Sequence, residues 1–480
     1  MKLRGADLLA RTLAAGGVKH VFTLSGNHVM PVFDAALDAK LNLIHVRHEA
    51  AAVHMADAWG RLTGEPGIAL VTGGPGHANA LGALYTALAA QSPMVLISGH
   101  APLNELGKGA FQEMPQAELA KPLTVASWTA KSANAVGRDI ARALREARKG
   151  PVHLSVPNDV LDAMADSKVP DMETPQPRTR KAPAALAKAK RPLVIAGPAA
   201  MRRQPKGEFP VIGMESPRGV NDPSLGKLAD VLAKADVVLL VGKRIDFTLK
   251  FGKIFAKSCR VFRAYGDVEL PQPSPSQKAW CDEVRTAIAY RPPEWKRIQD
   301  SLHPVAVCRG VQKLLDAPDA IFVSDGGEFG QWAQACLRAP RRVINGVAGS
   351  IGSALPFAAA AKVAFPGAPV VALLGDGTLG FHLSEIDTAV RHGLSYIAVV
   401  GNDACWNAEY QIQLRAYGAD RAHGLDLLPT RYGAVAAAMG AHGEDVSTPE
   451  QLAPALQRAA ASGKPALVNV MIERTAAPRY

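Results

Sequence analysis

The sequence predicts an α/β fold made of three doubly wound parallel-sheet domains. Short runs of β-branched residues end in Gly, Pro or polar residues, and segments with helical periodicity lie between them along the 480 residues. Strands that alternate with helices are typical of parallel sheets covered by helices on both faces. Two Pro-rich stretches, 161–190 and 269–277, interrupt the alternation and divide the chain into three parts.

The first part begins with a helix in GADLLARTLAAGG that leads into a strand. We expect a further helix in AAAVHMADAWGRLTG, between the second and third strands. The strands are predicted in the segments VKHVFTLSG, LNLIHVRHE, GIALVTGG, PMVLISGH and PVHLSVP. Residues 161–190 are charged as well as Pro-rich, and we expect them to form a linker without strands.

The second part is smaller than the other two. Its predicted strands are PLVIAGP, FPVIGM, ADVVLLVGKR and CRVFRAYGD. The third part starts near residue 303, and its predicted strands are AIFVSDGG, RRVINGVAGSIG, APVVALLGDG, LSYIAVVGND and ALVNVMIE. No sequence repeat relates the three parts.

The composition indicates a soluble globular protein. Hydrophobic residues make up 48% and charged residues 20% of the chain. No apolar run reaches the roughly 18–20 residues of a transmembrane helix, and the N-terminus lacks the apolar core of a signal peptide. The five cysteines are dispersed without a CxxC pair, which favours a reducing compartment. We therefore expect a cytoplasmic protein without a membrane partner.

The formal net charge of +11 raises the question of nucleic-acid binding. The basic residues are spread along the chain, and neither an RNP-like aromatic motif nor zinc-finger spacing accompanies them. We expect a basic surface with some attraction for anionic substrates and no nucleic-acid partner.

A pair of acidic residues follows two predicted strands of the third part. Asp376 lies in a Gly-Asp-Gly turn after PVVALLGDG, and Asp403 follows Asn402 after the next strand. One strand-to-strand crossover separates them, so both should lie at the carboxyl edge of a parallel sheet. Two carboxylates suit Mg²⁺, and flanking glycines such as Gly377 let backbone N–H groups approach phosphate oxygens. The pattern predicts a Mg²⁺-bridged diphosphate site.

This stretch resembles the diphosphate-binding motif of thiamine diphosphate (ThDP) enzymes, acetolactate synthase-like. The resemblance implies that Asp376, Asp403 and the backbone carbonyl of Cys405 bind the metal, and that Thr378 and Trp406 line the diphosphate. Asp403 stands where the family usually has a second Asn. The exchange keeps an oxygen ligand but adds a negative charge.

The resemblance also assigns a second set of cofactor residues. Glu49 opens a predicted helix, where an acid alone would complement the helix dipole; in the family this Glu hydrogen-bonds the pyrimidine N1′ and promotes loss of the C2 proton. The segment GGPGHAN matches the family's loop at Gly74, Gly76 and Asn79, with Ala78 in place of the usual Thr.

In INGVAGSIG, the resemblance implies that Gly349 binds the aminopyrimidine and that Ile351 holds the cofactor bent. It covers nearly the whole chain, as a pyrimidine-binding domain (1–163), a shortened central domain (185–290) and a diphosphate-binding domain (303–480). Between LVIAGPAAM and PVIGM the expected helix is missing, which weakens any carry-over of nucleotide binding there, such as the FAD of acetolactate synthases. A site shared between subunits implies at least a homodimer, and we expect a homotetramer.

Four residues are candidates for substrate contact. Asn27 and His28 follow the first strand, and His28 resembles the histidine of benzaldehyde lyase and of some 2-hydroxyacyl-CoA lyases. Phe111 and Gln112 resemble a Phe-Gln segment of acetolactate synthases. His77 is a weaker candidate.

We therefore expect a ThDP- and Mg²⁺-dependent carboligase or lyase that acts on 2-keto acids or 2-hydroxy carbonyl compounds through a ThDP-bound enamine, with Glu49, His28 and Gln112 as catalytic residues. Three alternatives stay open: a benzaldehyde-type or 2-hydroxyacyl-CoA lyase, a catalytically silent ThDP-binding homologue, and a Rossmann dehydrogenase. The last lacks a fitting G-x-G-x-x-G motif.

Overall fold

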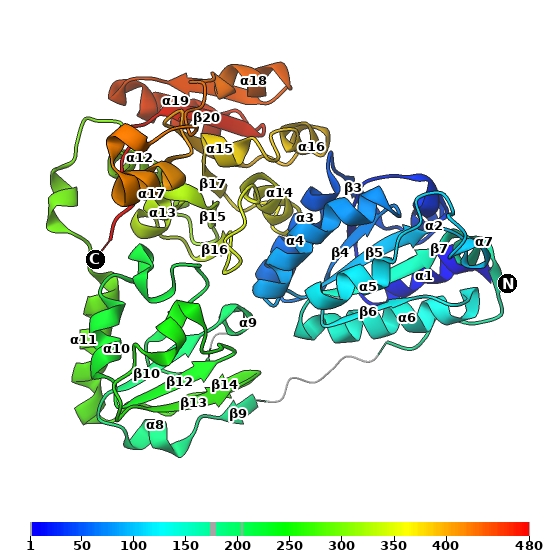
Figure 1. Ribbon diagram of the computed structural model, residues 1–480, viewed down its shortest axis with the longest axis horizontal. Helices are drawn as coiled ribbons and strands as arrows, with labels where there is room; N and C mark the ends of the chain where they lie inside the picture. The colour runs from blue at the N-terminus through cyan, green and yellow to red at the C-terminus, as the bar shows by residue number, and fades with distance from the viewer. Residues whose placement is uncertain (1, 173–178, 203–204, 480) are drawn as a thin grey trace. The chain divides into compact units, whose positions relative to one another are not determined.

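The computed structural model describes residues 2–172, 179–202 and 205–479 and confirms the predicted α/β fold class. Three parallel sheets of four or more strands are flanked by helices (Figure 1). The chain packs as two compact units. The first holds residues 2–172, 355–367 and 382–394, and the second holds the other described residues. Among the described residues, no helix is long and apolar enough to cross a membrane.

The N-terminal sheet has six parallel strands in the order β3-β2-β4-β5-β7-β6. Residues of α1, α2 and α6 bury apolar side chains against it in one core cluster. The strands are β2 (His20–Thr23), β3 (Asn42–His45), β4 (Gly67–Val71), β5 (Met94–His100), β6 (Ala126–Thr129) and β7 (Val152–Pro157). The helices are α1 (Gly5–Ala15), α2 (Met30–Asp38), α3 (Glu49–Thr63), α4 (Pro75–Ala89), α5 (Gln116–Ala120), α6 (Ala133–Glu146) and α7 (Asn158–Asp162).

The C-terminal sheet also has six parallel strands, in the order β16-β15-β17-β18-β20-β19. Numbered within each sheet, both orders read 2-1-3-4-6-5, so the two sheets share one topology although no sequence repeat relates them. The strands are β15 (Ile321–Ser324), β16 (Arg341–Ile344), β17 (Val370–Gly375), β18 (Ile397–Asn402), β19 (His442–Val446) and β20 (Ala466–Met471). The helices of this region are α12 (Pro304–Gln312), α13 (Gly327–Cys336), α14 (Ala354–Ala364), α15 (Asp376–Leu379), α16 (Glu385–Arg391), α17 (Asn407–Tyr417), α18 (Tyr432–Ala438) and α19 (Pro449–Ala461).

Sequence patterning missed one edge strand in each large sheet, β6 and β19. The β19 segment reads HGEDV, and four of its five residues are only half-buried. All four residues of β6 are half-buried too. An edge strand faces water along one side, so it lacks the continuous apolar run by which buried parallel strands are recognised.

The smaller sheet has the order β11-β10-β12-β13. Among the described residues between β10 and β11, the four-residue α9 (Pro198–Met201) is the only helix, which agrees with the expected lack of a full helix there. The strands are β10 (Pro192–Ala196), β11 (Val211–Gly213), β12 (Val237–Val241) and β13 (Arg260–Ala264), and the helices α8 (Ala184–Lys188), α10 (Leu228–Lys234) and α11 (Pro275–Ala289) belong to this region.

The prediction that residues 161–190 lack strands is wrong for two short segments. β8 (Met164–Ala165) pairs with β1 (Leu3–Arg4), and β9 (Thr179–Lys181) pairs with β14 (Asp267–Glu269). Such two- and three-residue strands form through pairing with a distant segment, which composition does not reveal. Residues 173–178 of the predicted linker lie outside the described residues.

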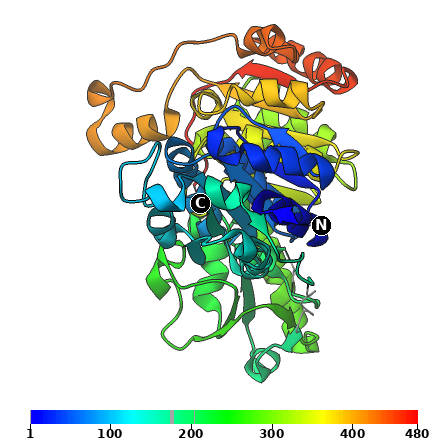
Figure 2. The same cartoon turned by 90° about the vertical axis from the view of Figure 1, so that its right-hand side faces the viewer.

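Two helices that follow strands of the C-terminal sheet, α14 and α16, belong by packing to the first unit. The segment after β18 takes another course: α17 and the loop behind it, orange in Figure 2, run away from the sheet before the chain returns with α18. The three-domain boundaries inferred from the sequence stay a prediction.

Candidate functional site

Two carboxylates lie at the carboxyl edge of the C-terminal sheet. β17 and β18 are adjacent, and Gly375 pairs with Gly401 at their ends. Asp376 directly follows β17 and opens α15, whereas Asp403 directly follows β18. Carboxyl ends of neighbouring parallel strands are where open α/β sheets bind ligands. Asp376 and Asp403 line the same cavity, so the two predicted metal ligands lie at one place.

Both carboxyl groups are poorly stabilised as anions. Asp376 is 2% exposed, and its Oδ2 has no hydrogen-bond partner among the described residues. Burial raises the pKa of Asp376 to about 6. Burial and, to a smaller extent, the charge of Asp376 raise the pKa of Asp403 to about 7. A divalent cation would offset both charges and give the unpartnered oxygen a ligand, so this donor set fits Mg²⁺.

The donor set is small. Across residues 2–172, 179–202 and 205–479, no three His, Cys, Asp or Glu side chains are grouped to hold a metal. An ion bound by Asp376 and Asp403 would therefore need backbone oxygen, water or phosphate oxygen to complete an octahedral set. This is the usual situation of Mg²⁺ that is shared with a bound diphosphate.

The turn after β18 is held rigidly, which explains the Asn of the Asn-Asp pair. The side-chain oxygen Oδ1 of Asn402 accepts a hydrogen bond from the Ala404 N–H at 3.1 Å, and its side-chain Nδ2 donates to Thr430 O at 3.0 Å. Ala404 has a left-handed φ of 52°. The Arg474 guanidinium donates to the Asp403 and Ala404 carbonyls at 3.1 and 3.2 Å. Asn402 thus shapes the turn that presents Asp403 and Cys405, rather than serving as a ligand itself.

The Gly-Asp-Gly turn leaves room for a ligand beside Trp406. A Cβ at Gly377 would lie 2.8 Å from the Trp406 ring, so only Gly fits there. The Thr378 hydroxyl donates to Gly375 O at 3.0 Å and closes the first turn of α15. These residues line a cavity of about 200 Å³, together with Asp403, Cys405 and the loop of Ile351. The predicted diphosphate residues therefore share one cavity.

The loop that carries Ile351 is fixed by two residues that sequence reasoning missed. Asp325, fully buried after β15, accepts hydrogen bonds from the N–H groups of Gly352 and Ala354 at 3.0 Å each. Burial raises the pKa of Asp325 to about 6. The Asn345 amide donates to Ser350 O at 3.1 Å. The signal was present in AIFVSDGG, where an acid follows a buried strand, but its backbone partners lie far along the chain.

Glu49 begins α3 in the first unit and is 7% exposed. The Asn79 amide donates to Glu49 Oε2 at 3.0 Å. A Cβ at Gly76 would lie 3.2 Å from Glu49 Oε1, so the Gly-Pro-Gly turn approaches this carboxylate closely. Gly74 has a φ of 56°, and a Cβ there would lie 2.5 Å from Gln112 O. Asn79 and the glycine turn thus both lie against the carboxylate of Glu49.

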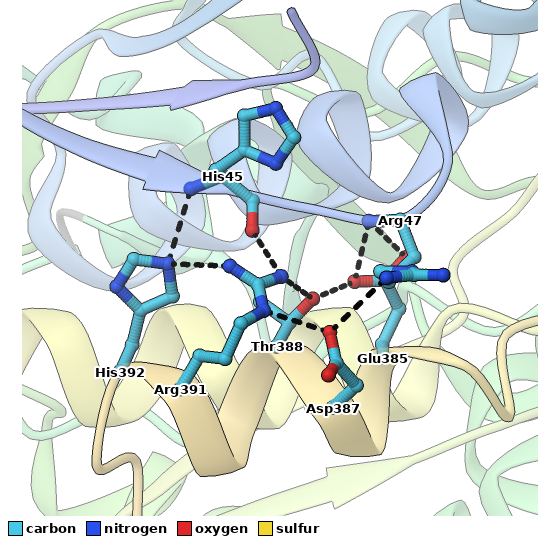
Figure 3. Close-up of polar contacts among 7 residues, drawn as sticks. All are labelled: His45, Arg47, Glu385, Asp387, Thr388, Arg391 and His392. Atoms are coloured by element: carbon cyan, nitrogen blue, oxygen red, sulfur yellow. Dashed lines mark hydrogen bonds and ion pairs between the residues drawn. The ribbon is translucent and has the colours of Figure 1, made fainter.

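The turn before Glu49 is held by α16, as Figure 3 shows. β3 is an edge strand of its sheet, and side chains of α16 bind its free backbone groups. His392 Nε2 accepts from the His45 N–H at 3.2 Å, and Arg391 donates to His45 O at 2.7 Å. The buried Glu385 carboxylate accepts from the Arg47 N–H at 3.1 Å. Sequence reasoning missed this clamp, because more than 300 residues separate its two sides.

The four predicted substrate residues differ in exposure. His28 is 2% exposed, its Nδ1 lies 3.2 Å from Thr72 Oγ1, and its ring stacks on that of Phe111 at 6.1 Å. Burial lowers the pKa of His28, so the imidazole is neutral at pH 7. Phe111 and Asn27 are exposed. Gln112 is half-buried with a left-handed φ of 58°, and its amide makes no hydrogen bond within the described part of the chain.

Two neighbours of this group have structural roles. Gln116, which sequence reasoning missed, is 1% exposed, accepts from the Gly74 N–H at 2.8 Å and donates to Gly99 O at 2.9 Å. His77 is fully buried, and its Nδ1 bonds Ser98 Oγ at 2.8 Å, so it stabilises the core under the glycine turn. The weaker suggestion that His77 contacts substrate is therefore not supported.

Two family models match the chain. The thiamine pyrophosphate enzyme N-terminal TPP binding domain matches residues 3–119, and the C-terminal TPP binding domain matches residues 325–470. Thiamine pyrophosphate is another name for thiamine diphosphate. The matched ranges include Glu49 with its glycine turn in the first and Asp325, Ile351, Asp376 and Asp403 in the second.

Curated relatives cover nearly the whole chain. The acetolactate synthase large subunit IlvG of Mycobacterium tuberculosis is 33% identical over 99% of this chain and 97% of its own. Human 2-hydroxyacyl-CoA lyase 2 is 29% identical over 98% of this chain and 90% of its own, and the 2-hydroxyacyl-CoA lyase of Arabidopsis thaliana is 28% identical over 98% and 95%. The alignments extend over 533, 578 and 560 positions, so these relatives carry residues that this 480-residue chain lacks.

Proposed function

Because this chain belongs to the thiamine pyrophosphate enzymes, we propose that it is a ThDP- and Mg²⁺-dependent carboligase or lyase that makes or breaks carbon–carbon bonds next to a carbonyl group. The observation that carries the proposal is the pair of carboxylates beside the Gly377 turn: the buried Asp376, whose Oδ2 has no partner among the described residues, and the half-buried Asp403. The 33% identity to an acetolactate synthase favours 2-keto acids as donors.

Separate residues are proposed to bind the cofactor and the substrate. When bound, ThDP supplies a carbon nucleophile at C2 and an electron sink. Asp376 and Asp403 would hold Mg²⁺ beside the diphosphate, and Gly377 and Thr378 would offer backbone N–H groups at the start of α15. Gly349 and Ile351 would hold the cofactor on the loop that Asp325 fixes. Glu49 would hold or move a proton at the pyrimidine ring.

The substrate side rests on His28 and Gln112. A neutral, buried imidazole can accept a proton from a substrate hydroxyl or donate one to a carbonyl oxygen. The Gln112 amide, which makes no hydrogen bond among the described residues, can donate to a carbonyl oxygen or accept from a hydroxyl of the substrate. Phe111 stacks on His28 and forms an apolar wall. We propose that the full site forms between the N-terminal unit of one subunit and the C-terminal unit of another, in a homodimer or homotetramer.

A second candidate is a lyase for 2-hydroxyacyl-CoA or benzoin-type compounds. Relatives at 28–30% identity are named 2-hydroxyacyl-CoA lyases, and His28 is placed for proton transfer to a hydroxyl group. A silent homologue is disfavoured by the presence of Glu49 with its Asn79 partner.

Product analysis tests the proposal. Purified protein with ThDP and Mg²⁺ is incubated in parallel with pyruvate, with benzoin and with a 2-hydroxyacyl-CoA, and products are identified by mass spectrometry. Acetolactate from pyruvate is the expected result. Aldehyde release from either of the other substrates would favour the lyase. No product in any reaction, with ThDP bound, would contradict the proposed function.

Replacing Glu385 by Ala should slow C2 proton exchange of bound ThDP by roughly 10- to 100-fold, because the turn that places Glu49 loses its acceptor for the Arg47 N–H. Glu385→Gln keeps one oxygen acceptor, so its exchange rate should lie between those of wild type and Glu385→Ala. Glu65→Ala, at an exposed acid outside the clamp, is the control. Exchange is followed by NMR in D₂O. Equal rates for Glu385→Ala and Glu65→Ala would show that the clamp does not position Glu49.

A further inference from the structure

A partly buried arginine lines the same cavity as the predicted cofactor residues. Arg218 precedes the 3-10 helix η5 (Gly219–Asn221) in the second unit and borders the cavity that holds Asp376 and Ile351. Gly219 has a φ of 55°, and a Cβ there would lie 2.1 Å from Thr248 O. The backbone next to Arg218 therefore packs directly against the 3-10 helix η7 (Phe247–Gly252).

The guanidinium of Arg218 has unused hydrogen-bonding capacity. Its side chain is 22% exposed, and its ion pair with Glu328 Oε2 is long, at 3.6 Å. The same Glu328 oxygen already accepts from the Ala477 N–H at 2.9 Å. Within the described residues, the guanidinium makes no hydrogen bond of ordinary length. Guanidinium carries five N–H donors, and burial without acceptors is costly.

The electrostatics agree with this geometry. Burial lowers the pKa of Arg218, and the nearby carboxylate of Glu328 compensates only in part. An anion in the cavity would satisfy the remaining donors. A carboxylate fits best, because its two oxygens match the planar fork of guanidinium in a bidentate pair.

The position within the cavity favours a substrate group over the diphosphate. Pro217, next to Arg218, approaches Gly349, where a Cβ would lie 3.8 Å from Pro217 Cβ. The loop of Gly349 and Ile351 is the one assigned to the ring end of the cofactor. The diphosphate has its own partners in Gly377, Thr378 and the metal carboxylates.

We propose that Arg218 binds the carboxylate of the substrate and so makes the site selective for 2-keto acids over neutral aldehydes and thioesters. This inference rests on the proposed function and gives its substrate class. Arg218 would hold the acid group while the adjacent carbonyl carbon reacts. If Arg218 instead binds the diphosphate of the cofactor, the same experiment should give a different result.

The test compares Arg218→Gln, Arg218→Lys and the control Arg244→Gln, which removes an exposed arginine of the same unit. On protein reconstituted with ThDP and Mg²⁺, three quantities are measured: the affinity for pyruvate by saturation-transfer NMR and its KM, the Kd of ThDP, and the C2 proton exchange rate. Arg218→Gln should weaken pyruvate binding by roughly 30-fold or more, with ThDP affinity and C2 exchange within about twofold of wild type. Arg218→Lys should recover part of the loss.

Each other outcome decides the question. Unchanged pyruvate affinity in Arg218→Gln, or a wild-type protein that exchanges the C2 proton but binds no pyruvate, would overturn the role of Arg218 and leave the proposed ThDP chemistry standing. Weakened ThDP binding with normal pyruvate affinity would assign Arg218 to the diphosphate instead. Loss of pyruvate binding in a protein that never exchanges the C2 proton would support Arg218 and refute the proposed function.

Discussion

Replacing Glu49 by Gln should lower turnover by about 10²- to 10⁴-fold and leave the fold intact. The amide keeps the size of the side chain and an oxygen that can accept from Asn79, which lies 3.0 Å from Glu49 Oε2. It cannot exchange a proton with the pyrimidine nitrogen. The loss should therefore appear in kcat and in C2 proton exchange, with little change in ThDP affinity.

The control for Glu49→Gln is Glu65→Gln, which alters an exposed acid just beyond the other end of α3. Thermal unfolding of both variants should match wild type within a few degrees. Near-normal turnover of Glu49→Gln would refute the role given to Glu49. A strongly lowered Tm for this variant alone would assign Glu49 to stability instead.

Asp376→Ala should abolish Mg²⁺-dependent ThDP binding, lowering affinity by roughly 100-fold or more, because the buried ligand of the ion is gone. Isothermal titration calorimetry with ThDP and Mg²⁺ measures this directly. ThDP and Mg²⁺ should raise the Tm of wild type by mass action and leave that of Asp376→Ala unchanged. Retained Mg²⁺-dependent affinity in the variant would place the metal elsewhere.

The same variant has a pH signature in the protein without cofactor. The pKa of Asp376 is raised from 3.8 to about 6 in the folded state, so the folded state binds more protons than the unfolded chain between these values. Below pH 3.8 the carboxyl group is protonated and does not lower the free energy of unfolding. Above pH 6 it is charged and lowers the free energy of unfolding by its full amount. Relative to wild type, the stability of Asp376→Ala should therefore rise as the pH increases from about 4 to about 6 and then level off. Asp420→Ala, at an exposed acid, should show no such trend.

The parts of this molecule that the sequence predicts are those with a local signal. Buried parallel strands such as β17 and β18 read as apolar runs, and a polar residue directly after each run marks the ligand-binding edge. Asp376 and Asp403 were found in this way, without any knowledge of distances. Glu49, Ile351 and Asn79 needed the family resemblance, because each alone looks like an ordinary helix or core residue.

The parts that the sequence does not predict depend on distant partners. Asp325 fixes the Ile351 loop through N–H groups of Gly352 and Ala354, and Glu385 holds the turn before Glu49 through the Arg47 N–H. Neither contact is marked by a periodicity or a motif in the sequence. Arg218 is similar, since its proposed role depends on the lack, among the described residues, of an acceptor at ordinary hydrogen-bond length. Contacts between side chains and backbone across long stretches of sequence become visible only in the folded chain.

The most direct test of the central claim is the C2 proton exchange rate of ThDP bound to the wild-type protein with Mg²⁺, measured by NMR after transfer to D₂O. An active ThDP enzyme must speed this step, and we predict exchange far faster than that of free ThDP and loss of the acceleration in Glu49→Gln. ThDP that binds with Mg²⁺ yet exchanges its C2 proton no faster than in solution would contradict the account and identify a catalytically silent homologue.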